Sequence, residues 1–592
     1  MEILDSQDSL CVFRRGESRT PGVQFLQISK PNGQVSVATA TEKLSPASPP
    51  RVVEGVVGII SLRITRYVIV ITKAHSVGAL RGHDVRQADK FDLIPLRDWK
   101  VKDETEAQYL KILRDHLQSQ IGNIFFSPTT DLTLSAQMNY KLSQEKNGLS
   151  EDVITRFLWN YHAAKDILPV ANSAPFLLRI IHGVVSLHQT SFCEQPIYFG
   201  LITRRSRFRA GTRYFRRGID GEGHVANFNE TEQILELPNG KKFSFVQTRG
   251  SVPTYWGEVN DLRYKPKLQV GKRSSVEAAR RHFDEQVHLY GKNYLVNLVN
   301  QSGYEKPVKM SYEDVVAALN DSNLEYVYFD FHHECSKMRW HRVDLLIDQL
   351  EGLGLDSQEW FELSPDSNVS RTQTSVVRTN CMDCLDRTNV VQSKLGRWVL
   401  QRQFQAGEVA QGPDPAFEKL FQNTWADNAD GVSKAYSGTG ALKTDFTRLG
   451  KRTKLGALSD LRNSITRYVK NNFCDGPRQD GYDLFLGNYH AWDSVQSPFF
   501  DGRPILTQSL PYVMLVSAVM VFAAIFFPKE DQSVLVNRLF IGTWACIFGI
   551  STKQLLKKGM DFVNWPRLLP VDYVVQAKDG SSIIERVDSK MQ

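Results

Sequence analysis

An uncharged apolar run near the C-terminal end is the feature that most restricts how this chain can fold. The run LPYVMLVSAVMVFAAIFF, from Leu510 to Phe527, holds 18 consecutive residues without a charge. A helix needs about 20 such residues to cross the hydrocarbon core of a bilayer, so the run predicts a transmembrane helix. A buried core helix is the alternative, but core helices usually keep a polar stripe along one side.

A second apolar run, LFIGTWACIFGIS, follows after a short linker. It reaches spanning length only together with the preceding VLVNR, in which Arg538 would extend its charge to the interface. The linker PKEDQ is nearly balanced in charge, whereas Lys553, Lys557 and Lys558 follow the second run. Because positive residues favour the cytosolic side, we expect a transmembrane hairpin over 508–552, a cytosolic tail over 553–592, and both chain ends in the cytosol.

The rest of the chain is large enough for more than one core. The whole chain has 592 residues, and the part before the hairpin still exceeds the roughly 250–300 residues at which single cores stop growing, so we expect at least two lobes. The seven cysteines form no paired framework, which favours a reducing compartment. The N-terminal stretch MEILDSQDSLCVFRRGES has no apolar segment of the kind that secretory signals carry. The net charge of +7 is too mild to identify a partner.

The first 180 residues have the pattern of an α/β or α+β lobe. VVEGVVGIISLRITRYVIVITKA contains β-branched runs interrupted by glycine, which indicate adjacent strands. In TEAQYLKILRDHLQSQIG, Tyr109, Ile112, Leu113 and Leu117 recur at helical spacing and predict a helix. We find no catalytic constellation in this part of the chain.

The sequence VVRTNCMDCLDRTNVVQ carries the chemistry. Cys381 stands six residues before Arg387, which is followed by Thr388. Three interpretations are open: a small buried cysteine, half of a metal pair with Cys384, or a nucleophile. A single C-x-x-C is weak support for zinc, although FDFHHEC adds His332 and further potential ligands. The polar neighbours of the motif argue against a packing role.

The nucleophile interpretation explains the most residues. The C-x5-R-T spacing suits a loop, between the strand SVV and the helix NVVQSKLGRWVLQRQF, that wraps around a phosphate. Arg387 would bind two phosphate oxygens as a fork, and Thr388 would bond the sulfur. The same positive field would hold Cys381 as the thiolate. The loop residues whose N–H groups would surround the substrate are Met382, Asp383, Cys384 and Leu385. This chemistry needs no metal and no cofactor.

Two aspartates are candidates for the acid that protonates the leaving group. Asp386 precedes Arg387 and is our preferred candidate, whereas Asp383 could instead shape the loop by accepting hydrogen bonds.

Two basic stretches are candidate contacts for an acidic substrate. RRSRFRAGTRYFRRG holds seven arginines, among which Arg204, Arg205 and Arg207 are candidate lipid-binding residues. Such a stretch fits single-stranded nucleic acid, the acidic headgroups of a membrane, or an ordinary solvated face. The phosphatase loop and the anchor favour the lipid and argue against nucleic acid. In GALKTDFTRLGKRTK, Lys443 and Lys451 are candidates on a loop near the site, with an ordinary surface loop as the alternative.

The motif RTNCMDCLDRTNVVQ, with RGSVPTYWGE, FDFHHEC and YSGTGALKTDFTRLGKR, resembles the Sac-domain phosphoinositide phosphatases over most of residues 1–500. With the apolar hairpin, it is most similar to the integral-membrane members of the endoplasmic reticulum and Golgi. The resemblance implies an N-terminal Sac subdomain, 1–180, packed on a cysteine-phosphatase domain, 181–500, that faces the cytosol. It also implies hydrolysis of phosphatidylinositol monophosphates, chiefly the 4-phosphate and also the 3-phosphate. The tail VDSKMQ departs from a dilysine retrieval signal, because Lys590 lacks a second lysine at the expected position.

Two other functions remain open from the sequence. A lipid-binding scaffold with little activity would keep the basic surface and the hairpin, and a protein tyrosine phosphatase would share the cysteine chemistry.

Overall fold

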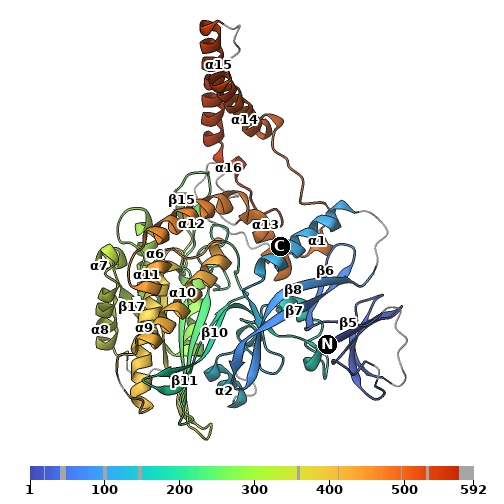
Figure 1. The fold of residues 1–592 in the computed structure, drawn as a ribbon, viewed down its shortest axis with the longest axis vertical. Helices are drawn as coiled ribbons and strands as arrows, with labels where there is room; N and C mark the ends of the chain where they lie inside the picture. Colours follow the sequence, from blue (N-terminus) through green and yellow to red (C-terminus); the bar gives the residue numbers. More distant parts are fainter. Residues whose placement is uncertain are drawn as a thin grey trace.

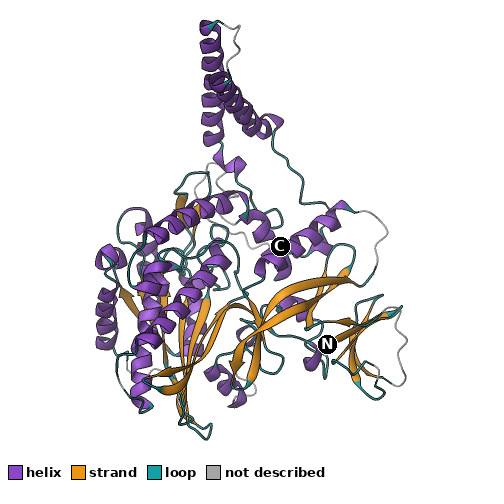
Figure 2. Ribbon diagram, in the orientation of Figure 1, coloured by secondary structure: helices purple, strands orange, loops and turns teal. Residues whose placement is uncertain are grey.

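The computed structural model describes residues 1–18, 20–40, 49–97, 103–144, 150–355, 360–410, 412–494, 496–527 and 533–571. Within these ranges the chain forms a mixed α/β body from which a pair of helices projects (Figures 1 and 2). The predicted fold class, with its C-terminal helical hairpin, is confirmed. The linker PKEDQ and most of the predicted tail, from residue 572, lie outside the described residues.

The chain begins with a small antiparallel sheet in the order β4-β3-β2-β1-β5. Its strands are β1 (Glu2–Asp5), β2 (Ser9–Phe13), β3 (Gln24–Ser29), β4 (Val35–Thr39) and β5 (Arg51–Val52). Apolar side chains of this sheet pack with those of the next strands and with Phe176 and Leu177 in one core. The small sheet therefore caps one end of the larger body.

A large sheet in the order β17-β16-β20-β13-β12-β11-β10-β9-β8-β7-β6 runs through both predicted lobes. Ile180, at the start of β10, pairs with Phe126 of β9, so the sheet continues across the predicted lobe boundary. The strands are β6 (Gly55–Ser61), β7 (Arg66–Leu80), β8 (His83–Pro95), β9 (Ile124–Phe126), β10 (Ile180–Phe192), β11 (Gln195–Arg205), β12 (Asn229–Glu236), β13 (Lys242–Arg249), β16 (Lys292–Asn297), β17 (Leu324–Tyr328) and β20 (Ser375–Asn380). Two short strands, β18 (Phe361–Leu363) and β19 (Val369–Arg371), extend from β13, and β14 (Trp256–Val259) pairs with β15 (Lys267–Val270).

The parallel part of the large sheet carries the motif around Cys381. β20 lies between β16 and β13 and is parallel to both, and β17 continues the parallel set. Strand alternation separates two cores: Tyr294 and Val296 of β16 face one core, and Leu295 faces the other. The sheet is therefore covered on both faces, which is the usual condition of parallel strands.

Helices fill the two layers. α8, α9 and α10 pack in the core that holds Tyr294, and α5 and α6 pack in the core that holds Leu295. The helices of the body are α1 (Glu104–Gln120), α2 (Ala136–Gln144), α3 (Glu151–Ile154), α4 (Tyr161–Ala164), α5 (Val276–Tyr290), α6 (Lys306–Leu319), α7 (Phe331–Glu334), α8 (Asp344–Gly352), α9 (Asp386–Ala406), α10 (Pro415–Ser437), α11 (Thr444–Leu449), α12 (Lys454–Phe473) and α13 (Asp475–Phe485). The predicted helix in the first lobe is confirmed as α1, which buries Tyr109, Leu113 and Leu117.

The hairpin consists of α14 (Ile505–Phe526) and α15 (Val534–Lys557), followed by the short α16 (Gly559–Phe562). Each of the two long helices is apolar and long enough to cross a membrane, and only 6% of its most apolar window is buried in the protein. They stand side by side, and the Asn537 side chain donates a hydrogen bond to the Ala524 carbonyl across the pair (3.1 Å). A buried core helix, the alternative for the first run, is therefore excluded.

Candidate active site

The motif forms a strand, a loop and a helix, as its spacing predicts. β20 ends at Asn380, the loop holds residues 381–385, and α9 begins at Asp386. The loop thus lies at the carboxyl end of a central parallel strand and at the N-terminus of a 21-residue helix. The carboxyl ends of parallel strands are common places for ligands. The helix N-terminus favours an anion, because its first N–H groups have no partner within the helix.

Cys381 is buried and hydrogen-bonded as a thiolate would require. The Cys384 N–H lies 3.1 Å from Cys381 Sγ, and the Thr388 hydroxyl lies 3.5 Å from it. Hydrogen bonding from Cys384, with the charge of Arg387 and the bond from Thr388, overcomes burial and lowers the pKa of Cys381 to about 6. Cys381 is therefore largely ionised at neutral pH.

Cys384 has the opposite chemistry. Its Sγ donates to the Gly250 carbonyl at 2.9 Å, and burial raises its pKa well above the usual range. Its backbone φ is +52°, a left-handed conformation that turns its N–H toward the sulfur of Cys381. Cys384 therefore stays a thiol and contributes its amide to the site.

Arg387 has one edge bound to the protein. Its Nη1 donates to the Leu298 carbonyl (2.8 Å), to Asn300 Oδ1 (3.2 Å) and to Glu305 Oε2 (3.0 Å), and its Nη2 donates to Glu305 Oε1 (2.8 Å). A guanidinium has five N–H groups. These bonds therefore leave Nε and the second N–H of Nη2 as a pair that can face a phosphate.

The two aspartates of the loop differ in environment. Asp383 receives Arg213 Nε and Nη2 at 2.9 and 2.7 Å, and Arg217 Nη2 lies 2.7 Å from it. Although burial opposes ionisation, these two arginines hold the pKa of Asp383 far below its usual range. Asp386 accepts only the Leu442 N–H among the described hydrogen bonds (2.9 Å), and burial raises its pKa.

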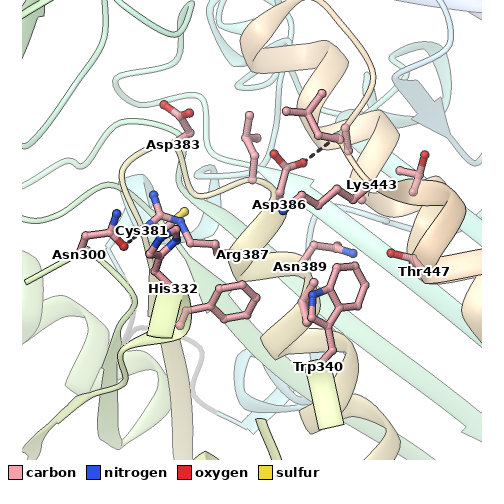
Figure 3. A pocket seen from close by; sticks show the side chains of 17 residues that line it. Asn300, His332, Trp340, Cys381, Asp383, Asp386, Arg387, Asn389, Lys443 and Thr447 are labelled. Carbon is pink, nitrogen blue, oxygen red and sulfur yellow. Dashed lines mark hydrogen bonds between the residues drawn. The ribbon is translucent and has the colours of Figure 1, made fainter. Parts of the chain in front are cut away.

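These groups surround a cavity of about 310 Å³ (Figure 3). Cys381, Asp383, Leu385, Asp386 and Arg387 line it from the motif. Met382 does not, since its side chain is buried in the core beneath β16 and its carbonyl accepts from Arg217 Nη1 at 2.9 Å. Asn389 and Val390, at the start of α9, also belong to the motif. The remaining lining residues come from four other segments: Asn300; Phe331, His332 and Trp340; Ala429; and Ala441, Leu442, Lys443, Thr444 and Thr447.

The predicted basic contacts separate into two groups. Lys443 lines the cavity, whereas Lys451 is exposed and is not among the described lining residues. Arg204 and Arg205 are each only 1% exposed. Arg204 pairs with Glu230 and Glu232, and Arg205 donates to the Tyr482 hydroxyl at 2.9 Å.

The placement of Arg204, Arg205 and Arg207 corrects the lipid-binding role suggested by the sequence. Arg204 and Arg205 end a strand covered on both faces, and Arg207 lies over the Tyr161 ring and bonds Asp152. The same arginine-rich stretch instead reaches the site through Arg213 and Arg217, which hold Asp383.

The histidines of FDFHHEC, which the sequence offers as further potential metal ligands, lie on a short helix. The strand β17 ends at Tyr328, and His332 and His333 lie on the short helix α7. Within the described ranges, no group of three or more His, Cys, Asp or Glu side chains is arranged to hold a metal ion. Glu305, which holds Arg387, was missed because it lies 82 residues before its partner and carries no recognisable spacing.

Comparison with known proteins finds a matching family model and several similar proteins. A family model described as the SacI homology domain matches residues 54–336. A phosphatidylinositol-3-phosphatase, SAC1, of Saccharomyces cerevisiae is 48% identical over 543 residues, which cover 88% of this chain and 86% of the relative. The phosphatidylinositol-3-phosphatase SAC1-B of Danio rerio is 40% identical over 90% of this chain and 92% of its own length. The phosphoinositide phosphatase SAC7 of Arabidopsis thaliana is 35% identical over 92% of this chain and 94% of its own length.

Proposed function

Because this chain belongs to the SacI homology family, we propose that it is a membrane-anchored phosphatase that hydrolyses phosphatidylinositol monophosphates through a phosphocysteine intermediate. The enzyme class, phosphoinositide phosphatase, is that of its curated relatives. The preference for the 4-phosphate over the 3-phosphate is our inference from the resemblance of the motifs. The names of the SAC1 relatives mention the 3-phosphate.

The observation that carries the proposal is the sulfur of Cys381, which lines the cavity and accepts hydrogen bonds from the Cys384 N–H and the Thr388 hydroxyl. The thiolate of Cys381, favoured by hydrogen bonding from Cys384, attacks phosphorus and forms the S–P bond while the P–O bond to inositol breaks. The free edge of Arg387 and the N-terminus of α9 face the phosphoryl oxygens. Water then cleaves the S–P bond, which releases phosphate and restores the thiolate.

Asp386 supplies the proton in this scheme. The inositol alkoxide is a poor leaving group, so its oxygen must be protonated as the P–O bond breaks. Burial raises the pKa of Asp386, which favours the protonated form, whereas Arg213 and Arg217 keep Asp383 ionised. After the transfer, the Asp386 carboxylate accepts a proton from the attacking water.

The apolar hairpin supports the anchoring part of the proposal. Two helices of spanning length stand beside the body, and Lys553, Lys557 and Lys558 follow the second apolar run. By the positive-inside preference, the catalytic body faces the cytosol. We propose the membranes of the endoplasmic reticulum and Golgi as the location, from the resemblance alone.

The test is phosphate release by the full-length protein in detergent and in liposomes. The substrates are phosphatidylinositol 3-, 4- and 5-phosphate and a phosphotyrosine peptide. We expect release from the monophosphates, most from the 4-phosphate, and none from folded Cys381→Ser, because a hydroxyl does not supply the anion at neutral pH. Cys474→Ser, at an exposed cysteine, is the matched control and should keep activity. Faster turnover of the peptide would favour a tyrosine phosphatase, and no turnover of any substrate would favour the scaffold.

A further inference from the structure

The helix α12 has its polar and apolar sides reversed. The described residues that it buries are all polar: Arg467, Asn471 and Asn472. Its large apolar side chains are instead 43–80% exposed, and they are Leu455, Leu458, Leu461, Ile465, Val469 and Phe473. At 3.6 residues per turn these six fall within an arc of about 120°. An ordinary surface helix turns its apolar stripe inward, so this outward stripe suits an apolar environment outside the protein.

The apolar stripe of α12 lies beside the base of the hairpin. α12 lies on the side of the body from which α16 and the hairpin emerge, and it runs across the direction of α15 (Figure 1). Its C-terminal end is joined to the base of the hairpin. The Asn564 N–H bonds the Asn472 carbonyl at 2.8 Å, and the Asn564 side-chain amide bonds the Phe473 carbonyl at 3.0 Å. The stripe is therefore continuous with the surface at which the two apolar helices leave the body.

The charges around the stripe are mostly positive. Lys451, Lys454 and Arg462 are exposed at its N-terminal half and along it. The acidic residue on this helix, Asp460, is paired with Arg452 and accepts the Lys443 N–H at 3.1 Å. Basic residues beside an apolar stripe attract anionic headgroups, and their long side chains can keep the charge at the interface.

We propose that α12 is an interfacial helix, which lies in the headgroup layer of the membrane that holds the hairpin and inserts its apolar stripe toward the acyl chains. This inference rests on the proposed anchoring by α14 and α15. A bilayer fits better than a protein partner, because the stripe adjoins the hairpin and because the basic residues Lys454 and Arg462 share its arc, where their long side chains can carry the charge up to the headgroups. Helices of this kind bury their apolar side about 5–10 Å into the interface.

The inner side of α12 connects the membrane contact to the catalytic loop. Ser464, Arg467 and Tyr468 line a second cavity of about 300 Å³, which Asp383 and Asp386 line from the loop. One helix therefore contacts lipid on one side and forms a wall beside the reacting groups on the other.

The first test measures the depth of α12 in the full-length protein, without use of activity. An environment-sensitive fluorophore is placed at Ile465→Cys after Cys193, Cys474, Cys546 and the reactive Cys381 are replaced by serine. The protein is reconstituted in phosphatidylcholine vesicles with a minority of phosphatidylserine. We expect quenching by lipids with a nitroxide on the acyl chain and protection from aqueous iodide. The matched control is the same label at Leu345→Cys on α8, which is 46% exposed and should show the reverse.

Two results would overturn the proposal. One is a label at residue 465 that iodide quenches and lipid nitroxide does not. The other is a label shielded from both quenchers in a manner that depends on protein concentration, which would indicate contact between two copies of the chain. Flotation of the protein with the vesicles separately reports whether the hairpin anchors it.

The second test compares substrates in the intact enzyme. Ile465→Glu places a charge in the stripe, and Leu345→Glu places one on a distant exposed site. Ile465→Glu should lower the ratio of turnover on bilayer phosphatidylinositol 4-phosphate to turnover on a soluble aryl phosphate by about fivefold, because a charge opposes insertion of the stripe. Leu345→Glu should leave this ratio unchanged. An equal ratio in both variants contradicts the inference, whereas a parent enzyme inactive on every substrate contradicts the proposed function.

Discussion

Replacing each of the two aspartates by asparagine distinguishes a residue that donates the proton from a residue that shapes the loop. Asp386→Asn is expected to slow hydrolysis of phosphatidylinositol 4-phosphate by about 10²–10⁴-fold, which is the usual contribution of a positioned acid. An aryl phosphate has a better leaving group, so its hydrolysis should fall by less than about tenfold. The reason is that burial raises the pKa of Asp386, which suits it to proton donation better than Asp383, whose pKa two arginines lower.

Asp383→Asn is the matched control, with a different expected cost. The Asp383 side chain is 20% exposed and is bound by both nitrogens of the Arg213 fork, whose side chain is 19% exposed. Loss of the carboxylate leaves Arg213 with no acidic partner among its described contacts, which typically costs about 3 kcal/mol of folding free energy. Arg217 keeps Glu258. Both substrates should therefore lose turnover alike, and the melting temperature should fall.

The effect on stability depends on pH in opposite directions for the two aspartates. The folded-state pKa of Asp383 is depressed, so its contribution is present above its unfolded pKa and is lost as pH falls through the folded value. The folded-state pKa of Asp386 is raised, so its ionised form destabilises the fold at neutral pH. Asp386→Asn should therefore not lower the melting temperature at pH 7.

The assay is kcat/KM on both substrates across pH, together with thermal unfolding. The parent profile should be bell-shaped, because attack needs the Cys381 thiolate, whose pKa is lowered to about 6, and departure of inositol needs the proton of Asp386. The fall should be absent in Asp386→Asn. If this variant loses both activities equally and keeps the falling limb, the acid is another residue, and the reasoning from burial is wrong.

Three further predictions concern the arginine, the second cysteine and the topology. Arg387→Lys should lower kcat/KM on the lipid at least about 10²-fold, because a point charge cannot both bind Glu305 and present a fork; activity near the parent value would show that the fork is not used. Mild peroxide should convert Cys381 to a sulfenic acid that condenses with Cys384 to a disulfide, and a thiol reductant should restore activity. Equal recovery of Cys384→Ser would contradict that step. Tags at both chain termini should be open to protease in sealed microsomes, and protection of the C-terminal tag would indicate a single span.

Local sequence patterns predicted the elements that depend on neighbours in the chain. The motif predicted β20, the loop and α9 in their correct order. A loop that wraps around a phosphate needs a strand just before it and the start of a helix just after it, so the prediction depends only on neighbouring residues. The apolar runs gave α14 and α15, since length and lack of charge decide whether a helix can cross a membrane. The 3.6-residue period of α1 was recognisable for the same reason.

Contacts between distant segments were not predictable in the same way. Arginines in a basic stretch look alike in sequence, yet Arg204 and Arg205 are buried by the sheet while Arg213 and Arg217 reach the loop. The pairing of β11 with β12 places Arg204 and Arg205, and the path of the chain after β11 places Arg213 and Arg217. The spacing of arginines along the sequence reveals neither. The reversal of α12 was also hidden, because a helical period does not tell which side faces the protein.

The pKa values of Asp383 and Asp386 depend on which charged side chains lie directly against each carboxyl group. Two carboxylates three residues apart have pKa values shifted in opposite directions, because Arg213 and Arg217 bind Asp383 directly, whereas at Asp386 the effect of burial exceeds that of the more distant Arg467. The arginines lie more than 150 residues before the loop, as their bonds to Asp383 and Met382 show. The ionised Asp383 then fixes the loop on which Cys384 turns its N–H toward Cys381. The basic stretch therefore serves the chemistry indirectly, since it holds the loop in the shape that lets the cysteine ionise.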